Sequence, residues 1–308
     1  MTPAPLRHDV RLPRDSHELG AWHYPPTSEV LRDSSGRAPA VVLGHGYGFT
    51  RDSGLARYAE RFAAAGLHAV VFDYSGFGDS GGGPREVVRI DAQRRDFACA
   101  LAATRALPDV DPSRVALWGT SYSGGVVIAA AADDGAVAAV VAQVPNLDNL
   151  ATARFLVRTT PPTMLAWLSL VVSHDVVRGL LRRDPYCVRA VGRTGERAAY
   201  VSDESWAQVA QLAGPSWRNR IGMRDFAALP VFRAVSFLDR LPCRVHLTAA
   251  DHDDLTPVRP TLDAAARLGG RAELQRFPTG HFGVYLPPFF DDVVAGQTDF
   301  LRRELHPG

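Results

Sequence analysis

A serine between two small residues lies in a turn that connects a strand pattern to a helix pattern. Residues 115–118 form a short apolar run that predicts a buried strand, and residues 126–132 predict a helix. Between them, the segment Gly119-Thr-Ser121-Tyr-Ser123 places Ser121 at the corner. A sharp strand-to-helix turn exposes its central side chain above the sheet, as a nucleophile requires. Ser121 is therefore the predicted nucleophile.

A second serine in the same turn is an alternative nucleophile. The segment Ser121-Tyr-Ser123-Gly-Gly125 also has the form of a serine between small residues. Ser121 is favoured because it comes three residues after Trp118, the last large apolar residue of the predicted strand. Ser123 would already lie in the first turn of the helix.

A base and an acid that could activate such a serine follow later strand patterns. His281 comes shortly after the last predicted strand, and Asp253 lies in the loop after the strand before it. A serine nucleophile needs a histidine that accepts its proton and a carboxylate that orients this histidine. Because the carboxyl ends of parallel strands meet at one edge of a sheet, we expect Ser121, Asp253 and His281 to form a catalytic triad.

The acid of this triad has competitors in the same loop and elsewhere. Asp251, Asp253 and Asp254 lie close together, and Asp253 is preferred at four residues before Pro257. Asp148, which follows the preceding strand, is the alternative acid. The cluster Asp251-His-Asp-Asp does not predict a metal site, because consecutive residues cannot all converge on one ion. No metal and no cofactor are expected.

Two backbone N–H groups are placed to bind the oxyanion of an acyl-transfer reaction. The Tyr122 N–H is at the start of the helix that follows Ser121. The Tyr47 N–H is in the glycine-rich segment Gly44-His-Gly-Tyr-Gly48, whose flanking glycines leave the backbone free to present it. His45 is interpreted as a hydrogen-bonding brace of this loop.

The elements that position these residues alternate between strand and helix. This alternation predicts an α/β fold with a mostly parallel sheet flanked by helices. The pattern is interrupted at residues 146–238, where we find apolar helical segments and no clear strand. We therefore expect an α/β core made of residues 1–145 and 239–308, with residues 146–238 as an inserted helical cap. Large apolar residues of this cap are expected to line the substrate pocket: Met164, Trp167, Met223 and Phe226.

Composition excludes several classes of function. The chain has 308 residues with 34 basic and 33 acidic ones, so no strong field favours nucleic acid or an anionic membrane. No residue is lysine, which excludes Schiff-base chemistry. The three cysteines are scattered, which suggests a reducing compartment. We expect no signal peptide in residues 1–15, no membrane span and a cytoplasmic location. The oligomeric state is left open.

Together these motifs resemble the α/β-hydrolase superfamily over about two-thirds of the chain. The resemblance lies in His45-Gly46, Asp73-Tyr-Ser-Gly-Phe-Gly-Asp-Ser80, the turn at Ser121, Asp253 to Pro257, and Gly280-His281. More narrowly, Trp118-Gly-Thr-Ser-Tyr-Ser-Gly-Gly125 and Gly280-His-Phe282 resemble the dienelactone-hydrolase-like and X-Pro-dipeptidyl-peptidase-like branch. Dienelactone hydrolases proper carry cysteine where this chain has Ser121. Arginine usually stands at the position of Ser75, so the resemblance implies no ion pair there.

The expected activity is that of a serine hydrolase acting on an ester or thioester of a small-molecule hydrophobic acyl substrate. An acyltransferase or a lactone-forming enzyme with the same acyl-enzyme is the first alternative. A catalytically silent ligand-binding protein on the same fold is the second. The substrate itself does not follow from these residues.

Overall fold

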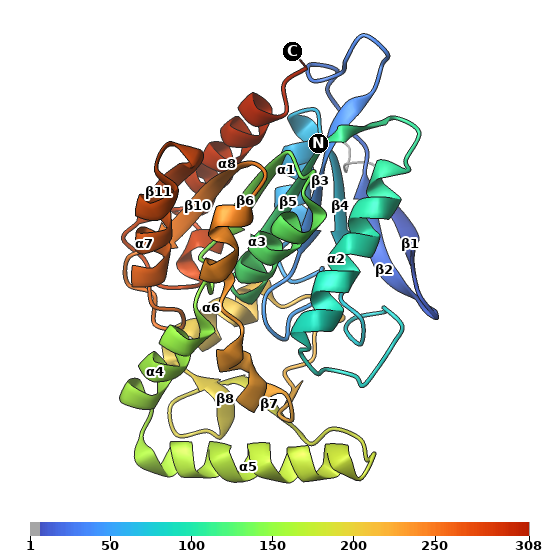
Figure 1. Cartoon of the computed structure of the whole chain (residues 1–308). Coiled ribbons are helices and arrows are strands. Elements are labelled where there is room, and N and C mark those ends of the chain that lie inside the picture. Colours follow the sequence, from blue (N-terminus) through green and yellow to red (C-terminus); the bar gives the residue numbers. More distant parts are fainter. Residues whose placement is uncertain (1–6, 308) are drawn as a thin grey trace.

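An eight-stranded sheet lies at the centre of the computed structural model, which describes residues 7–307 (Figure 1). Its strands lie in the order β1-β2-β4-β3-β5-β6-β10-β11. They are β1 (His8–Arg14), β2 (His17–Tyr24), β3 (Ala38–Gly44), β4 (His68–Phe72), β5 (Val110–Thr120), β6 (Ala139–Gln143), β10 (Arg244–Ala250) and β11 (Ala272–Phe277). The neighbours from β4 to β11 pair in parallel, whereas β2 pairs antiparallel with both β1 and β4. The predicted, mostly parallel sheet is confirmed.

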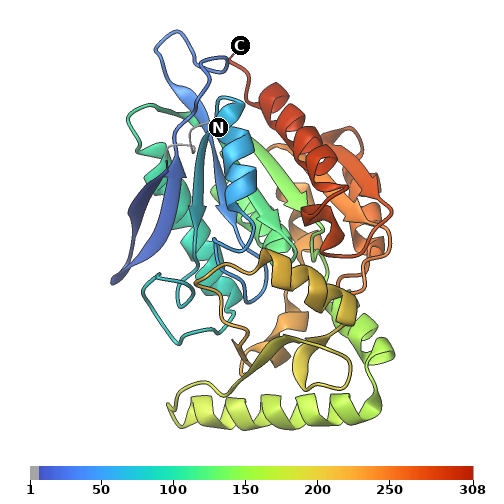
Figure 2. The same ribbon diagram turned by 180° about the vertical axis from the view of Figure 1, so that it is seen from behind.

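Helices cover both faces of this sheet. They are α1 (Ala56–Ala64), α2 (Ile90–Arg105), α3 (Tyr122–Asp134), α7 (Arg259–Leu268) and α8 (Phe290–Glu304). The two opposite views show α2 and α3 on one face and α1 and α8 on the other (Figures 1 and 2). Strands β3 and β4 are buried along their whole length. This double cover explains why the central strands are continuous apolar runs without alternation.

A long insertion separates β6 from β10. It consists of α4 (Asn149–Thr159), α5 (Pro162–Leu180), β7 (Cys187–Gly192), β8 (Ala198–Val201), α6 (Asp203–Leu212), β9 (Ile221–Gly222), η1 (Phe226–Val231) and η2 (Ala234–Arg240). Besides helices, which the sequence predicted here, it contains a small sheet, β8-β7-β9, which the sequence did not predict. At four residues, β8 is too short to show an alternating pattern, and β9 has only two.

The insertion lies beyond the end of the sheet at which β5 stops, and α5 is its most distant element (Figures 1 and 2). Its last element, η2, instead packs against α3 and α7 of the core. Ala234 and Leu238 of η2 are fully buried there. The final residues of the proposed range 146–238 thus lie beside the core and not over the site.

Within residues 7–307, no helix is long and apolar enough to cross a membrane. The same residues contain no group of three or more histidine, cysteine, aspartate or glutamate side chains that could hold a metal ion. Of the stretch expected to lack a signal peptide, residues 1–6 lie outside the described part of the chain.

Candidate active site

Ser121 occupies a strained corner between β5 and α3. Its φ of 56° and ψ of −123° are values that residues other than glycine rarely adopt. Backbone hydrogen bonds hold the corner: the Ser121 N–H donates to the Gln143 carbonyl at 2.8 Å, and the Asn146 N–H donates to the Ser121 carbonyl at 2.9 Å. A Cβ atom on Gly119 would lie 2.4 Å from the Ser123 carbonyl oxygen, so only glycine fits this tight turn.

The alternative nucleophile, Ser123, points into the core. Its side chain is fully buried, and its hydroxyl forms a hydrogen bond with the Tyr74 hydroxyl. Ser123 does not line the pocket into which Ser121 opens. A substrate in that pocket would therefore meet Ser121 and not Ser123.

His281 links Ser121 to Asp253 through its two ring nitrogens. Its Nε2 atom lies 2.9 Å from Ser121 Oγ, and its Nδ1 atom lies 2.7 Å from Asp253 Oδ2. Because a carboxylate only accepts hydrogen bonds, Nδ1 carries the proton and Nε2 is left to accept one from the serine hydroxyl. The structure thus brings together the three residues that sequence analysis selected.

The Asp253 carboxylate is held by its own loop. It accepts hydrogen bonds from the Leu255 N–H at 2.9 Å, from the Thr256 N–H at 2.7 Å and from the Thr256 hydroxyl at 2.9 Å. Thr256 was not identified from the sequence. An aspartate that accepts hydrogen bonds from the residues just after it is a common turn motif, and this pattern could have indicated Thr256.

The competing carboxylates have other partners. Asp251 pairs with Arg276, and Asp254 accepts a hydrogen bond from the Ser202 hydroxyl. Asp148 caps α4 by accepting hydrogen bonds from the Leu150 and Ala151 N–H groups, and it forms an ion pair with Arg233. None of the three contacts the His281 ring among the hydrogen bonds of the described residues.

The glycine-rich loop after β3 lies against the Ser121 side chain. A Cβ atom on Gly46 would lie 3.3 Å from Ser121 Cβ, so the backbone that leads into Tyr47 passes directly beside the Ser121 side chain. The other expected donor, the Tyr122 N–H, is at the first position of α3, where no helical carbonyl one turn earlier can accept from it. Both expected oxyanion donors therefore belong to segments next to Ser121.

His45 braces this loop as a neutral imidazole. Its Nδ1 atom lies 3.0 Å from the Gly46 carbonyl oxygen, and its Nε2 atom accepts from the Tyr74 N–H at 3.4 Å. Complete burial lowers the pKa of His45 to about 4. Nearby, the buried Asp73 carboxylate accepts the Arg51 N–H at 2.6 Å and pairs with the Arg51 guanidinium. This ion pair, which was not predicted, anchors the residue just past the loop.

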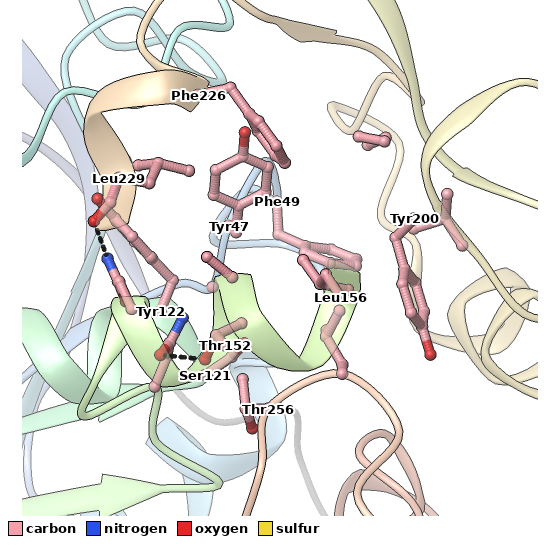
Figure 3. Close-up of a pocket in the computed structure, with 18 of the residues that line it drawn as sticks. Tyr47, Phe49, Ser121, Tyr122, Thr152, Leu156, Tyr200, Phe226, Leu229 and Thr256 are labelled. Carbon is pink, nitrogen blue, oxygen red and sulfur yellow. Dashed lines mark hydrogen bonds between the residues drawn. The ribbon is translucent and has the colours of Figure 1, made fainter. Parts of the chain in front are cut away.

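Ser121 opens into a pocket of about 400 Å³ between the sheet and the insertion (Figure 3). Among the described residues that line this pocket, none carries a formal charge. The lining includes Phe49, Leu156, Tyr200, Phe226 and Leu229, which the close-up shows around the space near Ser121. This surface is suited to an apolar, uncharged group.

Only one of the four predicted cap residues lines this pocket. Phe226 does, whereas Met164, Trp167 and Met223 do not. Met223 is fully buried as part of the hydrophobic core. On α5, Leu165 and Leu168 face the pocket instead. Trp167 lies on another side of α5, because it is two residues from Leu165 and successive residues of a helix are rotated by about 100°.

The fold and the site define an α/β hydrolase, and comparison with known proteins places it more narrowly. Residues 15–232 match the family described as X-Pro dipeptidyl-peptidase (S15 family). The chain belongs to this family.

Several curated relatives match almost the whole chain. The quorum-quenching protein AidA of Acinetobacter baumannii (strain MDR-ZJ06) is 33% identical over 97% of this chain and 95% of its own length. The polyketide transferase grgF of a Penicillium species is 32% identical over 94% of each chain. The thiohydrolase apmlB of Arthrinium phaeospermum is 28% identical over 89% of this chain and 92% of its own length.

Solved structures agree on the fold. The crystal structure of the α/β hydrolase GrgF from Penicillium sp. sh18 superposes with a TM-score of 0.80 at 23% identity, covering 97% of this chain and 99% of that one. The hypothetical protein PA2218 from Pseudomonas aeruginosa gives a TM-score of 0.78 at 20% identity, covering 96% of this chain and 93% of that one. The predicted α/β-hydrolase resemblance and the narrower S15-like branch are both confirmed.

Proposed function

We propose that the protein is a serine hydrolase that cleaves an ester or thioester of a hydrophobic acyl group through an acyl-enzyme. The observation that carries this proposal is the chain of hydrogen bonds from Ser121 Oγ through His281 to Asp253, at 2.9 Å and 2.7 Å. These distances are within the range that proton transfer from a nucleophile to a base requires.

In this mechanism, His281 Nε2 accepts the Ser121 proton while Oγ attacks the acyl carbon. Asp253 stabilises the imidazolium that forms. The Tyr47 and Tyr122 N–H groups bind the negative charge that develops on the carbonyl oxygen, and loss of one such donor costs on the order of 10²–10³ in rate. His281 then protonates the leaving alcohol or thiol. Water, activated by the same imidazole, attacks the acyl-enzyme and releases the acid.

The pocket supports an acyl substrate over a dipeptide, despite the name of the family. A dipeptidyl peptidase must bind the free α-ammonium group of its substrate, and a buried ammonium group needs a carboxylate partner. No carboxylate side chain is among the described residues that line the pocket. An apolar acyl chain needs no such partner.

Acyl transfer is the second candidate, because the relative grgF, 32% identical, is named a polyketide transferase. In that reaction an alcohol or amine, in place of water, would attack the same acyl-enzyme and take over its acyl group. A catalytically silent ligand-binding protein would have no use for the strained corner at Ser121.

The test is a panel of p-nitrophenyl esters and neutral N-acetylcysteamine thioesters with acyl chains of two to twelve carbons, assayed with and without added alcohols and amines. Mass spectrometry identifies the products. Free acid as the main product supports hydrolysis, and an acylated acceptor supports transfer. Absence of any turnover together with dipeptide release from X-Pro peptides would contradict the proposal.

A further inference from the structure

A second cavity, of about 570 Å³, lies on the outer side of α4 and is rich in arginine. The elements that form it are α4, η2, α7 and the segment that leads into α7. We call it the arginine groove after five of its lining residues: Arg154, Arg158, Arg233, Arg259 and Arg267. Of the described residues that line it, two are acidic, Asp148 and Asp263.

Three of these arginines are neutralised by carboxylates and two are not. Arg233 pairs with Asp148, Arg259 with Asp263 and Arg267 with Asp239. Arg154 and Arg158 form no ion pair and no side-chain hydrogen bond within residues 7–307, and both are exposed.

These two arginines are one helical turn apart on α4, so their guanidinium groups extend from the same face. Phe155, the residue after Arg154, lines the groove as well and provides an apolar wall. The groove therefore carries an excess positive charge that a multivalent anion would complement.

The groove adjoins the active-site pocket across a single helix. Asn149, Thr152 and Leu156 of α4 line the active-site pocket, whereas Arg154, Phe155 and Arg158 line the groove. A helix with its side chains is about 10–12 Å across. The loop that carries the acid also touches both spaces: Thr256 lines the pocket, and Pro257 lines the groove.

We propose that the arginine groove binds the phosphate of a phosphopantetheine thioester while its acyl group occupies the pocket at Ser121. This inference rests on the proposed thioester activity. The pantetheine part of this group is uncharged and longer than the width of α4, and the phosphate is attached at its far end, so the whole group can connect an apolar pocket to a cationic groove. No charged residue is among the described residues that line the active-site pocket, so the phosphate would be recognised outside this pocket. Arg154 and Arg158 would then determine the preference among acyl donors without contacting the reacting atoms.

The test compares three thioesters of the same hexanoyl group: the neutral pantetheine thioester, the 4′-phosphopantetheine thioester and the coenzyme A thioester. The double variant Arg154→Gln and Arg158→Gln should raise KM about tenfold for the two anionic donors and leave kcat unchanged. KM for the neutral donor should not move. Comparing KM for the coenzyme A thioester with KM for the 4′-phosphopantetheine thioester shows whether the nucleotide phosphates contribute to binding or the pantetheine phosphate suffices. Glutamine keeps the helix propensity of arginine, so α4 should persist.

Arg302→Gln on α8 is the matched control, because this arginine is also exposed and forms no ion pair within residues 7–307. It should leave all three KM values unchanged. As a measurement independent of any variant, raising the salt concentration with the wild-type protein should raise KM for the anionic donors alone.

Equal KM values for neutral and anionic donors, unaffected by salt and by the double variant, would overturn the inference. If the neutral thioester is still hydrolysed in that case, the proposed function stands without it. If no thioester of any kind is hydrolysed, the proposed function itself fails.

Discussion

The Asp253 carboxylate and the His281 imidazole are joined by a hydrogen bond of 2.7 Å between Oδ2 and Nδ1, and both side chains are almost completely buried. Asparagine at position 253 would have the size of aspartate, but its amide could donate to Nδ1 and so favour the wrong imidazole tautomer. We therefore predict that Asp253→Asn lowers kcat by about 10³–10⁴ while melting temperature changes little. Steady-state hydrolysis of a p-nitrophenyl ester measures this.

The neighbouring carboxylates provide the controls. Asp251→Asn and Asp254→Asn should lower kcat far less, because their partners are Arg276 and Ser202. Asp148→Asn should affect stability through the α4 cap more than catalysis. A loss of activity in Asp148→Asn as large as that expected for Asp253→Asn would mean that the acid of the triad is assigned incorrectly.

Phe226 provides a test of the pocket. Its ring lines the apolar space near Ser121 (Figure 3), so Phe226→Ala should enlarge the room for the acyl chain. We predict a shift of preference toward longer acyl groups, with relative kcat/KM between chain lengths changing by roughly 1–3 kcal/mol. The series of p-nitrophenyl esters measures the shift.

Trp167 and Met223 serve as controls for Phe226, because both lie outside the pocket lining. Met223→Ala should lower the free energy of unfolding by about 2–5 kcal/mol, as expected for a fully buried side chain. Neither Trp167→Ala nor Met223→Ala should change the preferred chain length. If Trp167→Ala changes this preference as much as Phe226→Ala does, the description of the pocket is wrong.

The buried imidazole of His246 should make the free energy of unfolding depend on pH. This residue of β10 is fully buried, and neither ring nitrogen has a hydrogen-bond partner in the described structure. Burial lowers its pKa from 6.5 to about 4. Between these values the unfolded chain binds a proton that the folded chain does not, so stability falls as the pH is lowered from 6.5 toward 4.

Replacing this imidazole removes that proton linkage. When the pH is lowered from 7 to 5, the free energy of unfolding of the wild type should fall by about 2 kcal/mol more than that of His246→Leu. Urea unfolding at the two pH values measures the difference. His45 and His23, whose pKa values burial also lowers to about 4, should leave the variant with a residual acid sensitivity. If the difference in free energy of unfolding between His246→Leu and the wild type is the same at both pH values, this histidine is not buried in its neutral form.

Local signals in the sequence were sufficient for the sheet and for the candidate triad. The strand predicted at residues 115–118 lies within β5 in the structure, because a fully buried strand is an unbroken apolar run. Ser121, Asp253 and His281 could be selected because the carboxyl ends of parallel strands converge whatever the details of packing.

The pocket lining could not be predicted in the same way. Residues 164–172 of α5 are all apolar except Ser169, so their sequence does not reveal which side of the helix faces the pocket. Leu165 does and Trp167 does not, and tertiary packing alone decides between them. The ion pair of Arg51 with Asp73 joins residues 22 apart in sequence, and no local pattern indicated it.

The most direct test of the central claim is to locate the residue that a fluorophosphonate probe modifies. Peptide mass spectrometry of the labelled wild-type protein should find the adduct on Ser121, which lies 2.9 Å from the His281 base. Ser123→Ala should still be labelled, because the Ser123 hydroxyl is bonded to Tyr74 inside the core. Ser121→Ala should not be labelled. An adduct on Ser123, or labelling that persists in Ser121→Ala, would contradict the account.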